Sequence, residues 1–316
     1  MTDNTSGNKK PCVFIQTNAK QIVGATVAEH SFRRFSEHND KFDIRLMDNR
    51  DFPFFAAKEG KEFLRNGVYR RWEMADLQSF TPTRFMPPEL MGYVGRAVVV
   101  DPDVFALDDV WKLFEMDMQG KAIWCRPRKS GSTDINGNMA TSVMLLDCDK
   151  LKHWKVEEQF NSMFEGQLDY KDWVPLRNEP RDSIGLLDES WNHLDVLTKD
   201  THFLHTTKRI TQPWKTGLPV DFRPSDKFNK IPVVGWAMTM RRKLFGEYAL
   251  LGRYRQNPDM NQQHFFFGLL KECLDEGRID LKELKKEMKL NHVRHDAEAV
   301  LEETPPLMKT IAGLPA

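Results

Sequence analysis

One run of residues, from Arg96 to Phe105, constrains the fold of this chain more than any other. The apolar residues 97–100 are followed at once by Asp101, a proline and Asp103. An unbroken apolar run rich in valine predicts a strand that is buried on both faces, as in a sheet covered by helices. The two carboxylates then lie at the carboxyl end of that strand, where open α/β sheets bind ligands. They predict a site for Mg²⁺ or Mn²⁺ beside substrate phosphates, with an ordinary polar turn as the alternative.

The sequence that precedes this run predicts an α/β domain. Residues 12–16 form a short apolar run, residues 24–39 have helical spacing, and residues 42–47 form a second apolar run. This β–α–β order predicts a parallel sheet with helices on its faces. Further strands are expected at 121–125, 141–147 and 202–205, and further helices at 57–78, 108–115 and 154–164.

A change of composition near Gly217 predicts a boundary in the chain. Residues 1–11 are expected to be a disordered leader, residues 12–217 the α/β domain, and residues 218–316 a mostly helical extension. Within the domain, residues 165–182 mix charges and prolines and predict a long loop of the kind that is often functional. Helices of the extension are expected at 242–254, 262–276 and 281–289.

The bulk composition excludes several classes of protein. The 46 basic and 46 acidic residues cancel, which argues against a nucleic-acid-binding surface. The four scattered cysteines form no zinc motif or disulfide scaffold, so a reducing cytoplasm is expected. No apolar stretch is long enough for a membrane span, so contact with a membrane is expected to be peripheral at most. Basic residues near Arg242 and Lys285 predict solvated helix faces, or alternatively contact with anionic lipid or a lipid-linked acceptor.

Three further segments follow the order that a sugar transferase needs. Residues 79–90 precede the Asp-Pro-Asp strand, a Trp191-Asn192 pair follows the long loop, and residues 202–215 contain histidines, lysines and a Pro-Trp pair. Together with the Asp-x-Asp strand they resemble the GT-A fold glycosyltransferases of family eight, the glycogenin and bacterial lipopolysaccharide galactosyltransferase group. The resemblance covers roughly residues 12–217 and rests on the order and spacing of the motifs.

The resemblance implies a mixed, mostly parallel sheet and a metal-dependent enzyme. Such an enzyme moves a hexose from a nucleotide diphosphate sugar, usually a UDP-sugar, to a glycan, glycolipid or other acceptor with retention at the anomeric carbon. Its histidine ligand favours Mn²⁺ over Mg²⁺. Carried over by position, the metal ligands are Asp101, Asp103 and His205, the basic residue near the donor is Arg84, and the nucleoside is held by Gln16, Thr17 and Asn18.

The chain also departs from the family pattern. The segment 140–144 lacks the usual Asn and Gly, and Gln212 stands where a lysine usually precedes the Pro-Trp pair. Either Lys208 or Lys215 is therefore expected to contact the diphosphate, with Lys215 preferred. The usual Asp-Gln pair of the acceptor loop has no clear counterpart, and the candidate catalytic residues there are Asp169, which is preferred, and Asp172.

Two other functions compete with the transferase hypothesis. The altered motifs are compatible with a non-catalytic nucleotide-sugar-binding protein of the same fold, since a fold does not guarantee activity. A nucleotidyltransferase would carry a glycine-rich, basic loop after the first strand. Residues 16–21 contain one lysine and no glycine, which argues against it.

Overall fold

The strand that ends at Asp101 lies inside a six-stranded sheet of order β2-β1-β5-β8-β7-β9. In the computed structural model, which describes residues 9–222, 240 and 252–316, β5 pairs parallel with β1 and antiparallel with β8. The pairs β1–β2 and β7–β9 are parallel and β7–β8 is antiparallel, which confirms a mixed, mostly parallel sheet. The strands are β1 (Cys12–Thr17), β2 (Asp43–Asp48), β5 (Arg96–Val100), β7 (Ile123–Pro127), β8 (Met139–Asp147) and β9 (Ile184–Leu186).

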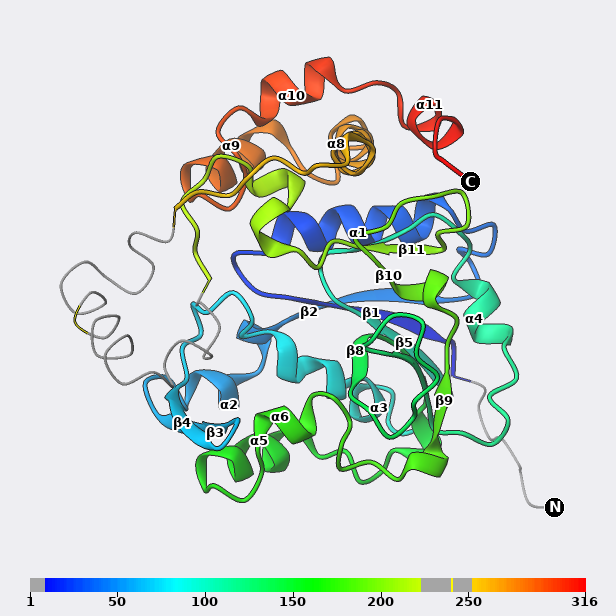
Figure 1. The fold of residues 1–316 in the computed structure, drawn as a ribbon, viewed down its shortest axis with the longest axis vertical. Helices are drawn as coiled ribbons and strands as arrows, with labels where there is room; N and C mark the ends of the chain where they lie inside the picture. Colours follow the sequence, from blue (N-terminus) through cyan, green and yellow to red (C-terminus); the bar gives the residue numbers. More distant parts are fainter. Residues whose placement is uncertain (1–8, 223–239, 241–251) are drawn as a thin grey trace. The chain divides into compact units, whose positions relative to one another are not determined.

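Both faces of the sheet are covered, as the apolar run before Asp101 predicts. Residues 97–100 have no exposed surface. Figure 1 shows α1 along one side of the sheet and α3, α5 and α6 on the other. Because side chains alternate along a strand, Val13 and Ile15 face α1, whereas Phe14 packs into the aromatic core of the opposite side. The helices are α1 (Ile22–Arg34), α2 (Pro53–Ala56), α3 (Pro87–Leu90), α4 (Trp111–Glu115), α5 (Val156–Phe164) and α6 (Tyr170–Trp173).

The prediction of a helix at 57–78 is wrong, because this segment contains a β-hairpin. Strands β3 (Glu62–Arg65) and β4 (Val68–Arg71) pair antiparallel around a two-residue turn. The turn residues Asn66 and Gly67 have φ angles of 59° and 74°, the left-handed region that two-residue hairpin turns require. The Asn-Gly pair therefore decides the local structure, and Phe63 and Trp72 secure it by packing into the core.

A second, smaller sheet contains β6 (Val104–Ala106), β10 (His193–Leu194) and β11 (Phe203–His205), in the order β10-β11-β6. Strand β11 pairs antiparallel with β6 and parallel with β10. The expected strand at 202–205 is thus present. The segment 165–182, expected to be a long loop, also contains the short helix α6 and therefore has more regular secondary structure than predicted.

The chain divides into two compact units, residues 1–205 with 315–316 and residues 206–314. In the second unit nine residues of α8 (Met260–Asp275) are buried, and Trp214 stacks on Phe266 at a ring-centroid distance of 4.6 Å. The helix expected at 242–254 and the basic residues near Arg242 fall almost wholly outside the described residues, as does most of the expected leader. The other helices are α9 (Leu281–Lys289), α10 (Ala297–Glu303) and α11 (Leu307–Ala312).

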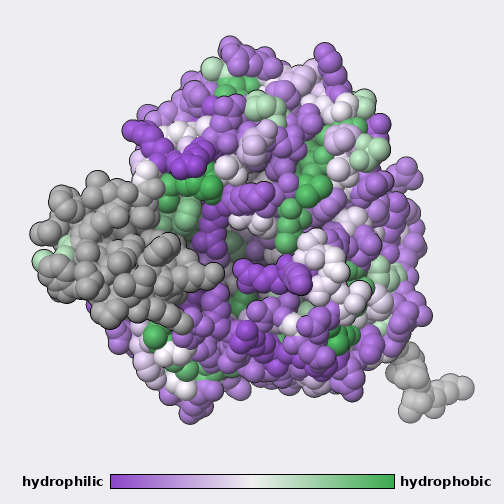
Figure 2. Space-filling model, viewed as in Figure 1, coloured by the Kyte–Doolittle hydropathy of each residue, from purple (hydrophilic) through white to green (hydrophobic). Residues whose placement is uncertain are grey.

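The described helices are short or polar in composition. Among them, none combines the length and apolar character that crossing a bilayer requires. On the face shown in Figure 2, hydrophilic residues predominate and hydrophobic ones are scattered between them.

Candidate metal centre

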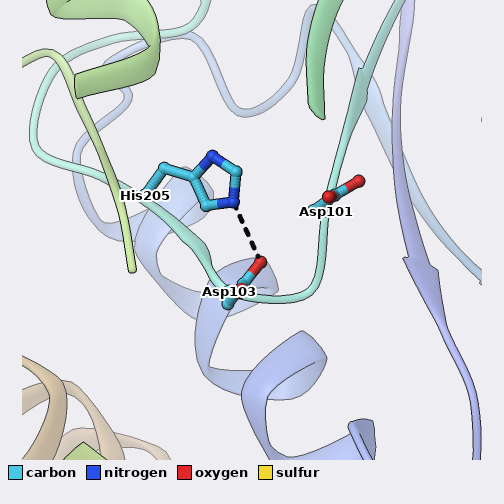
Figure 3. A group of neighbouring side chains, drawn as sticks. All are labelled: Asp101, Asp103 and His205. Carbon is cyan, nitrogen blue, oxygen red and sulfur yellow. Dashed lines mark ion pairs between the residues drawn. The ribbon is translucent and has the colours of Figure 1, made fainter. Parts of the chain in front are cut away.

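The six-stranded and the three-stranded sheet of the first unit bring Asp101, Asp103 and His205 together. The chain leaves β5 at Val100, turns through Asp101 and Asp103, and continues as β6. Because β6 pairs antiparallel with β11, His205 lies opposite Val104, the residue after Asp103. One ligand atom from each of the three side chains lies within 4.8 Å of the others. Figure 3 shows the imidazole of His205 pointing toward Asp103, with Asp101 beside them.

The three side chains are largely buried and electrostatically linked. His205 Nε2 lies 3.4 Å from Asp103 Oδ1, and the side chains of His205 and Asp103 are 8% and 14% exposed. Burial lowers the pKa of His205, but Asp103 and Asp101 raise it more, so the net shift is upward. Burial and the charge of Asp103 raise the pKa of Asp101 against the opposing effect of Arg84. Two carboxylates that repel each other in a poorly hydrated place favour a bound cation.

The orientation of His205 is set by a buried amide. His205 Nδ1 donates to Asn192 Oδ1 at 2.9 Å, and Asn192 Nδ2 donates to Ser142 Oγ at 3.1 Å. Asn192 has no exposed surface. With the proton on Nδ1, the lone pair of the neutral ring lies on Nε2, the nitrogen that faces Asp103. The set of two carboxylates and one imidazole nitrogen therefore fits a divalent metal ion, and Mn²⁺ better than Mg²⁺.

Asp101 is held by two neighbouring polar side chains. Arg84 Nη2 lies 2.8 Å and 3.1 Å from the two carboxylate oxygens, and Gln16 Nε2 donates to Oδ1 at 2.7 Å. Arg84 Nη1 donates to Thr141 Oγ1 at 2.6 Å. Arg84 and Gln16 thus lie directly beside Asp101 and fix its carboxylate. The contacts of Arg84 with the donor and of Gln16 with the nucleoside stay predictions.

The turn between the aspartates lies against the start of α1. A Cβ atom on Gly24 would come within 2.8 Å of the carbonyl oxygen of Pro102, closer than real Cβ contacts. The backbone N–H of Asp101 donates to the carbonyl of Ser142 at 3.0 Å, so the turn is also tied to β8. The absence of a side chain at Gly24 lets the helix and the turn between the two aspartates approach each other.

The other predicted nucleoside residues are used within the protein. Asn18 Nδ2 donates to Ser79 Oγ at 3.0 Å and to the carbonyls of Asp76 and Leu77. Thr17 Oγ1 donates to the carbonyl of Asn18 at 3.2 Å. These bonds shape the loop that follows β1, and the contact of Thr17 and Asn18 with a nucleoside stays a prediction.

Both predicted catalytic acids have structural contacts. Asp169 accepts backbone N–H groups from Asn66 at 2.8 Å, Gly67 at 2.7 Å and Lys171 at 2.7 Å, so it caps α6 and holds the tip of the β3–β4 hairpin. Asp172 pairs with Arg177 at 3.0 Å on the surface. A catalytic role for either residue stays a prediction.

The two candidate lysines belong to the second unit. Lys215 has no exposed surface, and its Nζ lies 3.3 Å from Asp221 Oδ2 and 3.4 Å from the carbonyl of Asn291. Lys208 is exposed and precedes a short 3₁₀ turn. Contact of either lysine with a diphosphate stays a prediction.

Three supporting residues were missed at the sequence level: Thr141, Ser142 and the orienting role of Asn192. The sequence holds a signal for two of them, because Thr141 and Ser142 are the only hydroxyl residues in the otherwise apolar and buried part of β8 up to Leu146. A buried hydroxyl must find a partner, so the pair indicates a nearby polar site. The role of Asn192 depends on a side-chain contact across the fold and has no local signal.

Comparison with known proteins gives structural similarity at low identity. No protein-family model matches the chain, and no curated protein matches it. Similar solved structures include the galactosyltransferase LgtC in complex with donor and acceptor sugar analogues (14% identity, 65% of this chain and 89% of that chain, TM-score 0.44). They also include the glycosyltransferase GlyE of Streptococcus pneumoniae TIGR4 (14%, 85% and 64%, 0.45) and mouse xyloside xylosyltransferase 1 (13%, 63% and 97%, 0.39).

Proposed function

We propose that this protein is a metal-dependent glycosyltransferase that takes a hexose from a nucleotide diphosphate sugar, a UDP-sugar in the first instance, and transfers it with retention to a carbohydrate or lipid-linked acceptor. The observation that carries the proposal is the cluster of Asp101, Asp103 and His205 at the carboxyl end of β5, with His205 oriented by Asn192. The order of the motifs around this cluster supports the same reaction.

The residues of the cluster have distinct roles in this proposal. Asp101, Asp103 and His205 Nε2 hold the divalent ion, and Arg84 and Gln16 fix the carboxylate of Asp101. A divalent ion held there supplies positive charge against the diphosphate that leaves the sugar. Arg84 adds a second positive charge that is buried and anchored by Thr141.

Calorimetry of UDP binding with and without Mn²⁺ tests the donor site. We expect UDP to bind the wild type only with Mn²⁺, and we expect Asp103→Ala to abolish this binding. Asp108→Ala is the matched control, because Asp108 follows in the same segment but pairs with Lys112 outside the cluster. A folded wild type that binds no nucleotide in the presence of Mn²⁺ would overturn the proposal.

Turnover separates the enzyme from a non-catalytic binding protein. A screen of UDP-hexoses with water and with simple glycosides as acceptors, followed by proton NMR of the anomeric signal, is expected to show slow release of UDP and a product of unchanged anomeric configuration. Mn²⁺-dependent UDP binding without release of UDP from any donor would instead favour the non-catalytic alternative.

A further inference from the structure

The backbone of Asn192, the residue whose side chain orients His205, is held by a buried arginine. Asn192 is the last residue of the short 3₁₀ turn Glu189–Asn192, and Arg126 on β7 contacts both ends of this turn. Arg126 Nη1 donates to the backbone carbonyl of Asn192 at 2.9 Å, and Arg126 Nη2 lies 2.9 Å from Glu189 Oε1. The side chain of Arg126 is 1% exposed.

The buried guanidinium of Arg126 is an energetically costly choice of side chain for a strand in the sheet. Taking a guanidinium out of water is costly unless its partners are well arranged, and an apolar side chain would stabilise the sheet at lower cost. The planar guanidinium has two separated donors and can hold a carboxylate and a carbonyl at the same time. Arg126 donates one hydrogen bond to the carbonyl of Asn192 and forms an ion pair with Glu189, so both contacts fall on one turn and the position of Asn192 relative to β7 depends on Arg126.

Glu189, at the other end of the turn, also binds the loop that contains Ser130 and Gly131. Glu189 accepts hydrogen bonds from Ser130 Oγ and from the backbone N–H of Gly131. Burial raises the pKa of Glu189, but these hydrogen bonds and Arg126 lower it more, so the net shift is downward. Glu189 therefore stays ionised as the partner of Arg126.

We propose that Arg126 is a positioning residue for the metal ligand His205 and acts through Asn192. By holding the carbonyl of Asn192 and the carboxylate of Glu189, Arg126 fixes the turn so that Asn192 Oδ1 meets His205 Nδ1–H. This contact keeps the neutral imidazole in the Nδ1–H tautomer and leaves the Nε2 lone pair facing Asp103. The inference rests on the proposed metal site for its consequence, but the tautomer of His205 does not require a metal.

The first test is the tautomer of His205 in the metal-free protein. Nitrogen-15 NMR of the histidine rings, at a pH where His205 is neutral, distinguishes the two tautomers. We expect the Nδ1–H form to predominate in the wild type, and we expect Arg126→Met to shift the balance toward the Nε2–H form that Asp103 favours. Arg126→Lys keeps the buried charge and the pairing with Glu189, but one ammonium cannot hold both ends of the turn, so the same shift is expected there too.

The second test is Mn²⁺ affinity without nucleotide, measured by electron paramagnetic resonance. Loss of a group that orients a ligand weakens metal binding about 10-fold or more, which is the effect expected for Arg126→Met. Arg96→Met is the matched control, because Arg96 holds two backbone carbonyls, those of Phe114 and Met116, at the far end of β5 from Asp101. It should lower stability without changing Mn²⁺ affinity or the tautomer.

The outcomes separate this inference from the proposed function. A folded Arg126→Met or Arg126→Lys protein with the wild-type tautomer of His205 overturns the role of Arg126, whatever the metal does. A wild type that binds no Mn²⁺ overturns the metal site, while the tautomer still decides whether Arg126 positions His205. If Arg126→Met does not fold, Arg126→Lys alone decides.

Discussion

Gly24 shows how a single missing methyl group positions the candidate metal site. The first turn of α1 can lie against the carbonyl of Pro102 only because position 24 has no Cβ atom. The sequence predicted Asp101 and Asp103 as ligands, since an acidic pair after an apolar strand is a local pattern. It could not predict the contact between Gly24 and Pro102, because 77 intervening residues must fold before the two meet.

We expect Gly24→Ala to displace the turn that carries Asp101 and Asp103. The new methyl group meets a backbone carbonyl, so overpacking of about 1–3 kcal/mol opposes a gain of about 1 kcal/mol in helix propensity. Mn²⁺ affinity, measured by titration calorimetry, should fall together with thermal stability. Gly268→Ala in α8 is the control, because its Cβ would meet the side chain of Leu307 at 3.2 Å. Unchanged Mn²⁺ affinity in folded Gly24→Ala contradicts the expectation.

The β3–β4 hairpin shows where sequence periodicity misleads. Apolar residues between 57 and 78 recur with spacings that suit a helix, but the segment also contains the pair Asn66-Gly67. In the structure the turn chemistry prevails, since both residues adopt positive φ and the carboxylate of Asp169 accepts both of their N–H groups. Asp169 lies 103 residues after Asn66, so no local sequence pattern predicts the contact between them.

We expect Asp169→Ala to loosen the hairpin and the start of α6. Loss of three hydrogen bonds to one carboxylate should cost about 1–3 kcal/mol of the free energy of unfolding. Burial raises the pKa of Asp169, but its backbone hydrogen bonds lower it more, so the net shift is downward. The contribution of the carboxylate is therefore present above its ordinary pKa of about 3.9 and is lost as the pH falls through the lowered value.

Urea denaturation of wild type and Asp169→Ala at pH 7 and below pH 4 measures this difference, which should shrink in acid. Asp172→Ala is the control, because its ion pair with Arg177 is 44% and 50% exposed and should contribute about 0–1 kcal/mol. A variant Asp169→Ala as stable as the wild type at pH 7 would show that the hairpin does not depend on this clamp.

The two units differ in how much of their secondary structure and topology the sequence predicts. In the first unit the β–α–β order follows from local apolar runs, but the antiparallel direction of β8 does not, because a buried apolar strand has the same pattern in either direction. The two- and three-residue strands β10 and β9 are too short for any periodicity. In the second unit the expected helix 281–289 coincides with α9, since its capping box marks the start in the sequence.

The Pro-Trp pair of the second unit belongs to its core. Trp214 is 1% exposed and stacks on Phe266, and its carbonyl accepts the backbone N–H of Arg294 at 2.7 Å. We expect Trp214→Ala to cost about 3–5 kcal/mol. Hydrogen exchange should show faster exchange of the α8 amides, whereas Met308→Ala, at a side chain that is 55% exposed, should leave them unchanged. Protected α8 amides in Trp214→Ala would refute this role.

The ion pair between Arg84 and Asp101 has a consequence for the order in which ligands arrive. With His205 neutral, the charges of Asp101, Asp103 and Arg84 sum to minus one. An approaching diphosphate is repelled by this sum. A divalent ion inverts it to plus one, and the same place then attracts the anion. The cation is therefore expected to enter first or as a complex with the nucleotide, and raised ionic strength should weaken nucleotide capture by the loaded protein.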